Sequence, residues 1–340
     1  MKFQIIILLQ IFYSINAYEN QFETLCEGKA DAVFLWVNGT SPQHLEEMAK
    51  YGKVKVGGLY KDYGTLRFGL RSIVEFAPWI NRIFLVTNGE IPDYIDLEKG
   101  KESTPQLILV SHKDIIHQYF LPTFDSNVIE SYIHHIPGIS NCILYLNDDM
   151  MIGKPIEPDF FINKDSKLNV YYNGFTAPNK EGEKRSIWHR SVSHSNELLS
   201  EYYGNGEIIK HPYPSHHCYF MLRDHLQEME DRWFANYTES RENKFRKAND
   251  IVISFLHAGY TVEEQKGEYL RQRNYFYFNW WGGNRTTNIK TMNKIASFKY
   301  SCICLNDDIA NAPNADEEIQ FLYDRYSQIL PDPCPFEKVN

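Results

Sequence analysis

Two carboxylates follow an apolar run in the middle of the chain. Asn147, Asp148 and Asp149 follow the run 142–146, which predicts a buried strand. Open α/β sheets bind their ligands beyond the carboxyl ends of their strands. Adjacent carboxylates there suit a hard divalent cation that keeps waters and bridges phosphates. The same pair could instead cap a turn or the next helix, and spacing alone leaves the two interpretations even.

A third carboxylate lies on the segment before this strand. Isoleucines at helical spacing predict an amphipathic helix over 127–136, which a Pro-Gly pair ends. Glu130 and His134 are four residues apart and would share another face of that helix. Glu130 could serve a site, or it could complete a capping box begun by Asn127. Spacing alone favours the capping box.

Two arginines lie four residues apart on a second expected helix, over 63–76. Arg67 and Arg71 would share one face, and two guanidinium groups on one face can clamp a diphosphate. The alternative is a solvated basic face paired to Glu75. By spacing alone this alternative is at least as favourable.

The elements that must position these residues alternate along the chain. Strands are predicted over 31–37, 82–87, 106–111 and 142–146, with helices over 42–50 and 63–76 between the first two. Such alternation predicts an α/β fold with a largely parallel sheet and crossover helices. Later helices are expected over 224–234, 251–260 and 317–329. The aromatic run 275–281 is either a core strand, which we favour, or a stacking wall for a sugar or base.

Composition bounds the class of protein. The 340 residues are 43% hydrophobic, enough for the core of one large or two modest domains. The net charge of −9 argues against nucleic acid as a partner. A phosphorylated substrate is compatible with this net charge, because nearby Arg and Lys side chains can bind phosphate whatever the net charge of the chain.

The first residues predict a secretory signal peptide over 1–17, with an uncleaved anchor as the lesser alternative. In a secreted chain some of the six cysteines should form disulfides, although Cys142 is expected to be a buried free thiol. Asn236 and Asn284 begin glycosylation motifs. Asn38 also begins one, but it lies within another motif and is expected to stay unmodified.

Several of these stretches together resemble the Stealth family. The first conserved region of that family is similar to DAVFLWVNGT. The second is similar to two stretches, LR-x-x-LRS followed by APW, and then LPTF through YLNDDM. A third region is similar to the chain from about Asn196 to an R-x-x-x-D pattern at Arg246 and Asp250, and CICLNDD is similar to a fourth. The family includes bacterial capsule sugar-phosphate transferases and the eukaryotic N-acetylglucosamine-1-phosphotransferase that tags lysosomal enzymes.

The resemblance implies an α/β, Rossmann-like catalytic domain over 18–310. Its conserved regions lie near 31–40, 63–160, 188–260 and 300–308. A helical C-terminal part is expected to complete the site, and a C-terminal helix and tail occupy 311–340.

The resemblance also implies roles for individual residues. The metal, Mg²⁺ or Mn²⁺, is expected on Asp148, Asp149 and Asp307. The catalytic residues implied are His211, which directly precedes Pro212, with Glu130, Asp149 and Arg246. His216 and His217 compete with His211, and spacing does not dismiss them. The residues implied in donor binding are Asp31, Trp36, Asn38, Gly39, Arg67, Arg71, Thr87, Asn88, Gly89, Asn147, Asp250 and Asn306.

The activity implied is transfer of a sugar-1-phosphate to a hydroxyl of a glycan or glycoprotein acceptor. The resemblance favours N-acetylglucosamine-1-phosphate from UDP-N-acetylglucosamine, with release of UMP. A metal-dependent glycosyltransferase that releases UDP and a non-catalytic carbohydrate-binding protein are the alternatives. The secretory pathway, either the Golgi lumen or the exterior, is the expected location.

Overall fold

The computed structural model describes residues 21–52, 63–177, 186–272, 275–309 and 312–338. The expected signal peptide lies outside these residues. Within the described ranges, no helix combines the length and the apolar character needed to cross a bilayer.

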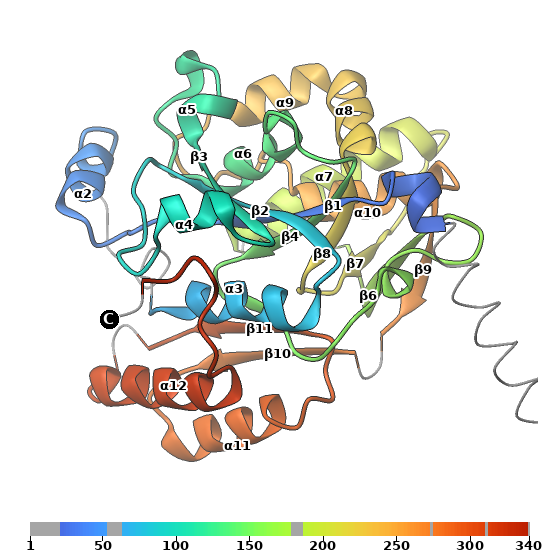
Figure 1. Cartoon of the computed structure of the whole chain (residues 1–340). Helices are drawn as coiled ribbons and strands as arrows, with labels where there is room; N and C mark the ends of the chain where they lie inside the picture. The colour runs from blue at the N-terminus through green and yellow to red at the C-terminus, as the bar shows by residue number, and fades with distance from the viewer. Residues whose placement is uncertain (1–20, 53–62, 178–185, 273–274, 310–311, 339–340) are drawn as a thin grey trace, which may run out of the picture.

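A five-stranded sheet forms the centre of the molecule (Figure 1). The strands lie side by side in the order β3 (Gln106–Ser111), β2 (Ile80–Thr87), β1 (Ala30–Leu35), β4 (Cys142–Asn147) and β8 (Tyr219–Leu222). All neighbours are parallel except β8, which runs antiparallel to β4. The fold is therefore α/β and Rossmann-like, as predicted, and the carboxyl ends of β1 to β4 meet at one edge.

Both faces of this sheet are buried, which explains why its strands read as continuous apolar runs. On β4, Leu144 packs into one core and Tyr145 into the other. Helix α3 (Thr65–Phe76) lies against the first face (Figure 1). The second face is covered by α6 (Ser126–Glu130), α7 (Ile187–Tyr203), α8 (Arg223–Arg232) and α10 (Ile253–Glu263).

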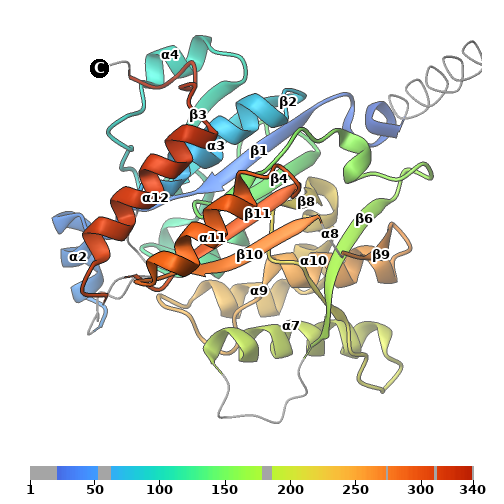
Figure 2. The same cartoon turned by 90° about the horizontal axis from the view of Figure 1, so that it is seen from below.

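A second sheet lies on the far side of α3. Its order is β10 (Phe276–Trp281), β11 (Cys302–Asp307) and β5 (Met150–Ile152), and β5 is antiparallel to β11. Two residues, Asp148 and Asp149, connect β4 directly to β5 and so pass the chain from one sheet to the other. Helices α11 (Arg285–Ile295) and α12 (Ala315–Ile329) lie on one side of this second sheet (Figures 1 and 2). The C-terminal part thus adds strands as well as the expected helices.

A third, smaller sheet and several short helices complete the described chain. The sheet has the order β7 (Pro212–Pro214), β6 (Leu168–Thr176) and β9 (Gly267–Arg271). Further α-helices are α2 (Pro42–Ala49), α4 (Leu97–Glu102), α5 (His112–Ile115) and α9 (Phe234–Arg241), and residues 21–26 are also helical.

The prediction of a single helix over 127–136 is wrong. Helix α6 ends at Glu130, and a separate 3₁₀ turn covers Ile133–His135. One reason is that the Ser131 carbonyl accepts a hydrogen bond from Arg241 Nη2 at 2.7 Å. The helix also begins earlier, since the Asp125 carboxylate caps it by accepting the Asn127 N–H at 3.0 Å. Glu130 is therefore not part of a capping box begun by Asn127.

The prediction of a free thiol at Cys142 is also wrong. Among the described residues, disulfides join Cys26 to Cys142 and Cys218 to Cys302. The first bond attaches the segment before β1 to the start of β4. Cys304 and Cys334 are free and buried.

Candidate active site

The turn between β4 and β5 places Asp149 beside β11. The Asp149 carbonyl accepts the Leu305 N–H at 3.0 Å, so the turn is held by the second sheet. At the end of β4, the Tyr145 hydroxyl donates to Asn147 Oδ1 at 2.6 Å. The backbone of the turn is thus held by β11, and the side chain that precedes the turn is held by Tyr145.

A second carboxylate, Asp307, ends β11 close to Asp149. Burial raises the pKa of Asp307, and the negative charges of Asp149 and Asp308 raise it further. Within the described structure, Oδ1 of Asp149 and Oδ1 of Asp307 are both buried without a hydrogen-bond partner. Buried carboxylate oxygens without a partner are costly. A divalent cation with oxygen ligands would relieve that cost, so these residues fit the expected metal.

His216 lies next to this carboxylate group. Ligand atoms of His216, Asp149 and Cys304 all lie within 4.8 Å of one another. The Nδ1 atom of His216 contacts the Tyr219 hydroxyl at 3.1 Å, which leaves Nε2 for another partner. Burial lowers the pKa of His216, with an opposing contribution from Asp149. The ring is therefore neutral near pH 7 and able to accept a proton.

Arg246 lies within electrostatic reach of both His216 and Glu130. The Arg246 guanidinium is exposed, and its Nη2 donates to Ser126 Oγ at 2.7 Å at the start of α6. Burial raises the pKa of Glu130 to about 7, although the charge of Arg246 and a hydrogen bond with Tyr145 favour ionisation. Glu130 is thus a buried acid that exchanges its proton near neutral pH.

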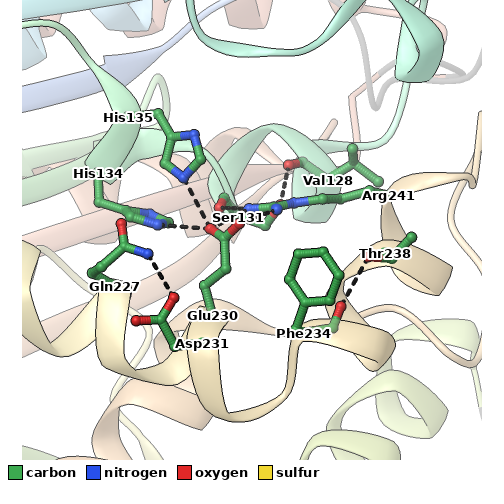
Figure 3. A network of polar contacts seen from close by, with 10 residues as sticks. All are labelled: Val128, Ser131, His134, His135, Gln227, Glu230, Asp231, Phe234, Thr238 and Arg241. Carbon is green, nitrogen blue, oxygen red and sulfur yellow. Dashed lines mark hydrogen bonds and ion pairs between the residues drawn. The ribbon is translucent and has the colours of Figure 1, made fainter.

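A buried network supports the end of α6 that carries Glu130 (Figure 3). Arg241 donates to both Ser131 Oγ and the Ser131 carbonyl, at 3.0 and 2.7 Å. The same guanidinium forms an ion pair with Glu230, whose carboxylate also contacts His134 and His135. His134 therefore faces Glu230 rather than sharing a helix face with Glu130.

His211, the expected base, lies elsewhere. It is buried, with Nδ1 at 2.9 Å from Asn196 Oδ1 and Nε2 at 3.1 Å from Glu263 Oε1. Neither partner belongs to the group around Asp149, so the structure does not place His211 with the other expected catalytic residues. His217 is buried and stacks on Phe276 with a centroid distance of 3.7 Å. Of the three candidates, only His216 is brought to the carboxylates.

The arginine pair on α3 binds the C-terminal tail. Arg71 donates Nε and Nη2 to the two carboxylate oxygens of Glu337, at 2.7 and 2.8 Å. Arg67 Nε lies 3.5 Å from the same carboxylate, and its guanidinium stacks on Tyr94 at 4.1 Å. Both expected roles therefore need correction, because Glu337 occupies the Arg71 fork that would clamp a diphosphate, and Glu75 is not its partner.

Other expected donor-binding residues gather at the carboxyl edge of the sheet. After β1, Trp36 is buried and the Asn38 side chain accepts the Thr40 N–H at 3.2 Å. After β2, Thr87 Oγ1 accepts the Gly89 N–H at 3.0 Å. The remaining residues of these two turns are Gly39 and Asn88, and Asn147 ends β4 at the same edge.

Three expected donor-binding residues have structural partners. Asp31 lies at the amino end of β1, at the opposite edge, and pairs with Arg82 at 2.7 Å. Asp250 is fully buried and accepts the Lys247 N–H at 2.6 Å, which supports the loop that carries Arg246. Asn306 Oδ1 lies 3.4 Å from Cys304 Sγ. Asp31 therefore cannot reach a ligand at the carboxyl edge.

Comparison with known families identifies three matching regions. Residues 28–53 match Stealth protein conserved region 1, residues 59–170 match conserved region 2, and residues 215–263 match conserved region 3. The chain belongs to the Stealth family. The third match contains His216, Arg246 and Asp250, but it begins after His211. The similarity of 302–308 to a fourth Stealth region stays a prediction.

Curated Stealth relatives cover most of this chain. The receptor polysaccharide phosphotransferase WefC of Streptococcus oralis is 28% identical, with 91% of this chain and 99% of the relative covered. The exopolysaccharide phosphotransferase SCO6023 of Streptomyces coelicolor is 27% identical over 91% of this chain and 52% of its own. The capsular polysaccharide phosphotransferase SacB of Neisseria meningitidis serogroup A is 29% identical, with 91% of this chain and 57% of the relative covered. The chain thus spans about half the length of several curated relatives.

One solved structure has a loose likeness to this Stealth chain. The galactosyltransferase LgtC, in complex with donor and acceptor sugar analogs, aligns over 89% of the chain at 9% identity with a TM-score of 0.42. That likeness is too slight to carry an argument about the site.

The site of this Stealth chain contains residues that the sequence interpretation did not select. Tyr145 faces Asn147 from the preceding strand, Tyr219 holds His216, and Cys304 contacts Asp149. Tyr145 precedes Asn147 by two residues, so strand alternation could have placed both on one face. The contacts of Tyr219 and Cys304 depend on how distant segments meet, and no local pattern indicates them.

Proposed function

We propose that this chain transfers a sugar-1-phosphate from a nucleotide sugar to a hydroxyl of a glycan acceptor. The observation that carries the proposal is the position of His216, a neutral proton acceptor, beside the carboxylate of Asp149 and within electrostatic reach of Arg246. Phosphoryl transfer needs a base, cation-binding carboxylates and positive charge in one place. The polysaccharide phosphotransferases among the relatives support the same class of reaction.

In this proposal Asp149 and Asp307, with Asp148, hold Mg²⁺ or Mn²⁺. The support is the pair of buried Oδ1 atoms that lack hydrogen-bond partners in the described structure. When bound, the cation neutralises charge on the donor diphosphate.

The chain's own side chains then have separate tasks. His216 accepts the proton of the acceptor hydroxyl as the new oxygen–phosphorus bond forms at the β-phosphorus of the donor. The bond from that phosphorus to the bridging oxygen breaks, and the nucleoside monophosphate leaves. Arg246, which is exposed, offsets negative charge on the transferred group. Glu130 orients a sugar hydroxyl, and its pKa of about 7 lets it donate or accept that hydrogen bond.

An aromatic surface beside His216 supports a glycan acceptor. Tyr275, Phe278 and Trp280, in or next to edge strand β10, are 45, 44 and 54% exposed. The Phe278 ring lies 5.6 Å from the His216 ring. Exposed aromatic faces can stack on sugar rings. These contacts support a stacking wall at Phe278 and Trp280 in place of the core that the sequence suggested. Tyr275 packs against Phe160 and Tyr171, and Trp281 is buried.

UDP-N-acetylglucosamine is the donor that we propose, with a glycan or glycoprotein as acceptor. We place the protein in the secretory pathway, in the Golgi lumen or outside the cell. The two disulfides support an oxidising compartment.

The test is identification of the nucleotide released. Purified protein is incubated with labelled UDP-N-acetylglucosamine, simple mannosides and Mg²⁺ or Mn²⁺. Release of UMP with a phosphodiester product supports the proposal, whereas UDP with a glycoside product indicates a glycosyltransferase. Donor binding without turnover of any nucleotide sugar would indicate a carbohydrate-binding protein.

A further inference from the structure

A free thiol lies at the proposed catalytic group and has no task in the reaction described above. Cys304 is fully buried, and its Sγ lies 3.4 Å from Asp149 Oδ2. The two cysteines nearest to the group in sequence, Cys218 and Cys302, are joined to each other, so Cys304 alone supplies a thiol there.

The thiol belongs to a three-residue set with metal-ligand chemistry. Ligand atoms of Asp149, His216 and Cys304 lie within 4.8 Å of one another. Tetrahedral Zn²⁺ with bonds of about 2.0 Å to oxygen and 2.3 Å to sulfur separates those two ligand atoms by about 3.5 Å. The Cys304 thiol donates a hydrogen bond to Asp149 Oδ2, and their sulfur–oxygen distance of 3.4 Å matches this separation. Three protein ligands and one open position are typical of zinc sites that bind an exchangeable fourth ligand.

The surroundings of the three ligands also suit a metal. The Tyr219 hydroxyl holds Nδ1 of His216 at 3.1 Å, and metal-binding histidines usually have such a partner on the second ring nitrogen. Asp149 Oδ1 is buried and has no hydrogen-bond partner in the described part of the chain. A carboxylate oxygen in that state can gain a cation without losing a hydrogen bond.

We propose that Asp149, His216 and Cys304 form a second coordination set, which takes a thiophilic divalent cation of the Zn²⁺ class. Mg²⁺ and Mn²⁺ prefer carboxylate and water ligands, whereas thiolate and imidazole favour Zn²⁺. Asp149 therefore belongs to two ligand sets: a hard set with Asp148 and Asp307 for Mg²⁺ or Mn²⁺, and a soft set with His216 and Cys304 for Zn²⁺. Binding to the soft set releases the thiol proton and occupies His216. If the proposed transfer reaction is correct, Zn²⁺ inhibits it by removing the base.

The test is titration of chelator-treated, donor-free protein with Co²⁺ in the absence of reductant, so that Cys218 and Cys302 stay bonded. The near-ultraviolet charge-transfer band of a Co²⁺–thiolate bond should appear, saturate at one equivalent and disappear when Zn²⁺ is added. Cys304→Ser should lose the band and weaken Zn²⁺ binding at least about tenfold. The matched control is Cys334→Ser, which changes the other buried free cysteine and should retain the band.

Absence of the band in the wild-type protein, or its persistence in Cys304→Ser, would overturn the proposal. If Cys304→Ser does not fold, His216→Ala keeps the thiol and should weaken Co²⁺ binding about tenfold. Unchanged affinity in that variant would remove His216 from the set. The band is measured without donor, so its absence would not contradict the proposed transfer reaction. Equally, a lack of turnover would not contradict the proposed Zn²⁺ site.

Discussion

Arg241 donates from Nη2 to the carbonyl of Ser131 across 2.7 Å, and Ser131 directly follows Glu130. The same guanidinium pairs with Glu230, whose side chain is 9% exposed. A buried ion pair in α8 and α9 thus fixes the end of the helix that presents Glu130. Removal of the Glu230 carboxylate leaves the buried charge of Arg241 without its ion-pair partner.

Glu230→Gln should therefore destabilise the protein by about 3–5 kcal/mol. Chemical unfolding measures the loss. Asp231→Asn is the matched control, because Asp231 is the next residue on α8 but is exposed, and its carboxylate accepts a hydrogen bond from the Gln227 side chain. Exposed positions of this kind usually change stability by less than about 0.5 kcal/mol.

The same carboxylate predicts a dependence of stability on pH. Burial opposes ionisation, but hydrogen bonds from Arg241 and the two histidines hold the pKa of Glu230 well below its usual range. A depressed pKa gives stability that is present above the unfolded pKa of about 4.3 and is lost as the pH falls. The free energy of unfolding should therefore fall more steeply below pH ~5 in the wild type than in Glu230→Gln. Parallel curves would contradict this assignment.

Asp125→Asn should stabilise the protein at alkaline pH. Burial and the charge of Asp250 raise the pKa of Asp125 to about 8. A raised pKa gives stability that is fully present below the unfolded pKa of about 3.9 and is lost as the pH rises through the folded value. Asn keeps an oxygen for the Asn127 N–H and cannot ionise. The free energy of unfolding, measured at pH 6 and 9, should rise in the variant relative to the wild type between the two pH values. An equal difference at both pH values would refute the raised pKa of Asp125.

His216→Ala should slow acceptor transfer by about 10²- to 10⁴-fold, the usual contribution of a general base. Donor affinity should change little, since metal ligands and Arg246 hold the diphosphate in the proposed reaction. His211→Ala is the matched comparison, and its effect should fall mainly on stability, because it leaves Asn196 and Glu263 without a ring partner. Because the pKa of His216 is lowered from 6.5, the wild-type rate should fall only below that pH. Single-turnover rates that are slower in His211→Ala than in His216→Ala would return the base to His211.

Asp149→Asn should abolish turnover while the protein still folds. Asn keeps the shape of the side chain but removes the charge that would hold the cation. In the wild type, donor at a hundredfold excess over its dissociation constant should stabilise by about 2.7 kcal/mol, and only with a divalent cation present. Thermal unfolding with donor, with and without chelator, measures this. Equal stabilisation in chelator would show that the cation does not connect donor and protein.

The sequence predicted strands β1 to β4 well because their signal is local. The runs that became these strands are largely apolar and bounded by turns, so composition alone reveals them. Strands such as β8 and β9 were not predicted. It also located Asp148 and Asp149 correctly at a strand end. The break in the helix after Glu130 was missed because its cause, Arg241, lies 110 residues away.

The same limit explains the errors at the site. Arg71 matched a functional pattern, but its partner Glu337 is 266 residues distant and no spacing points to it. Of the three candidate histidines, His216 and His217 are adjacent in sequence, yet one faces Asp149 and the other stacks on Phe276. Which of the two rings faces Asp149 depends on how the segment before β8 packs against the second sheet. Tertiary packing decides this, and local sequence does not.

The Cys218–Cys302 disulfide has a consequence for how the site assembles during folding. One cysteine is two residues after His216, and the other is two residues before Cys304. The set of Asp149, His216 and Cys304 draws on three distant stretches, and the bond joins two of them across a separation of 84 residues. In the chain-entropy account, closing a loop of this size beforehand removes about 4–5 kcal/mol of ordering cost. In the oxidised chain, assembly of this set therefore reduces from a three-body encounter to a two-body encounter, in which the turn after β4 has still to dock.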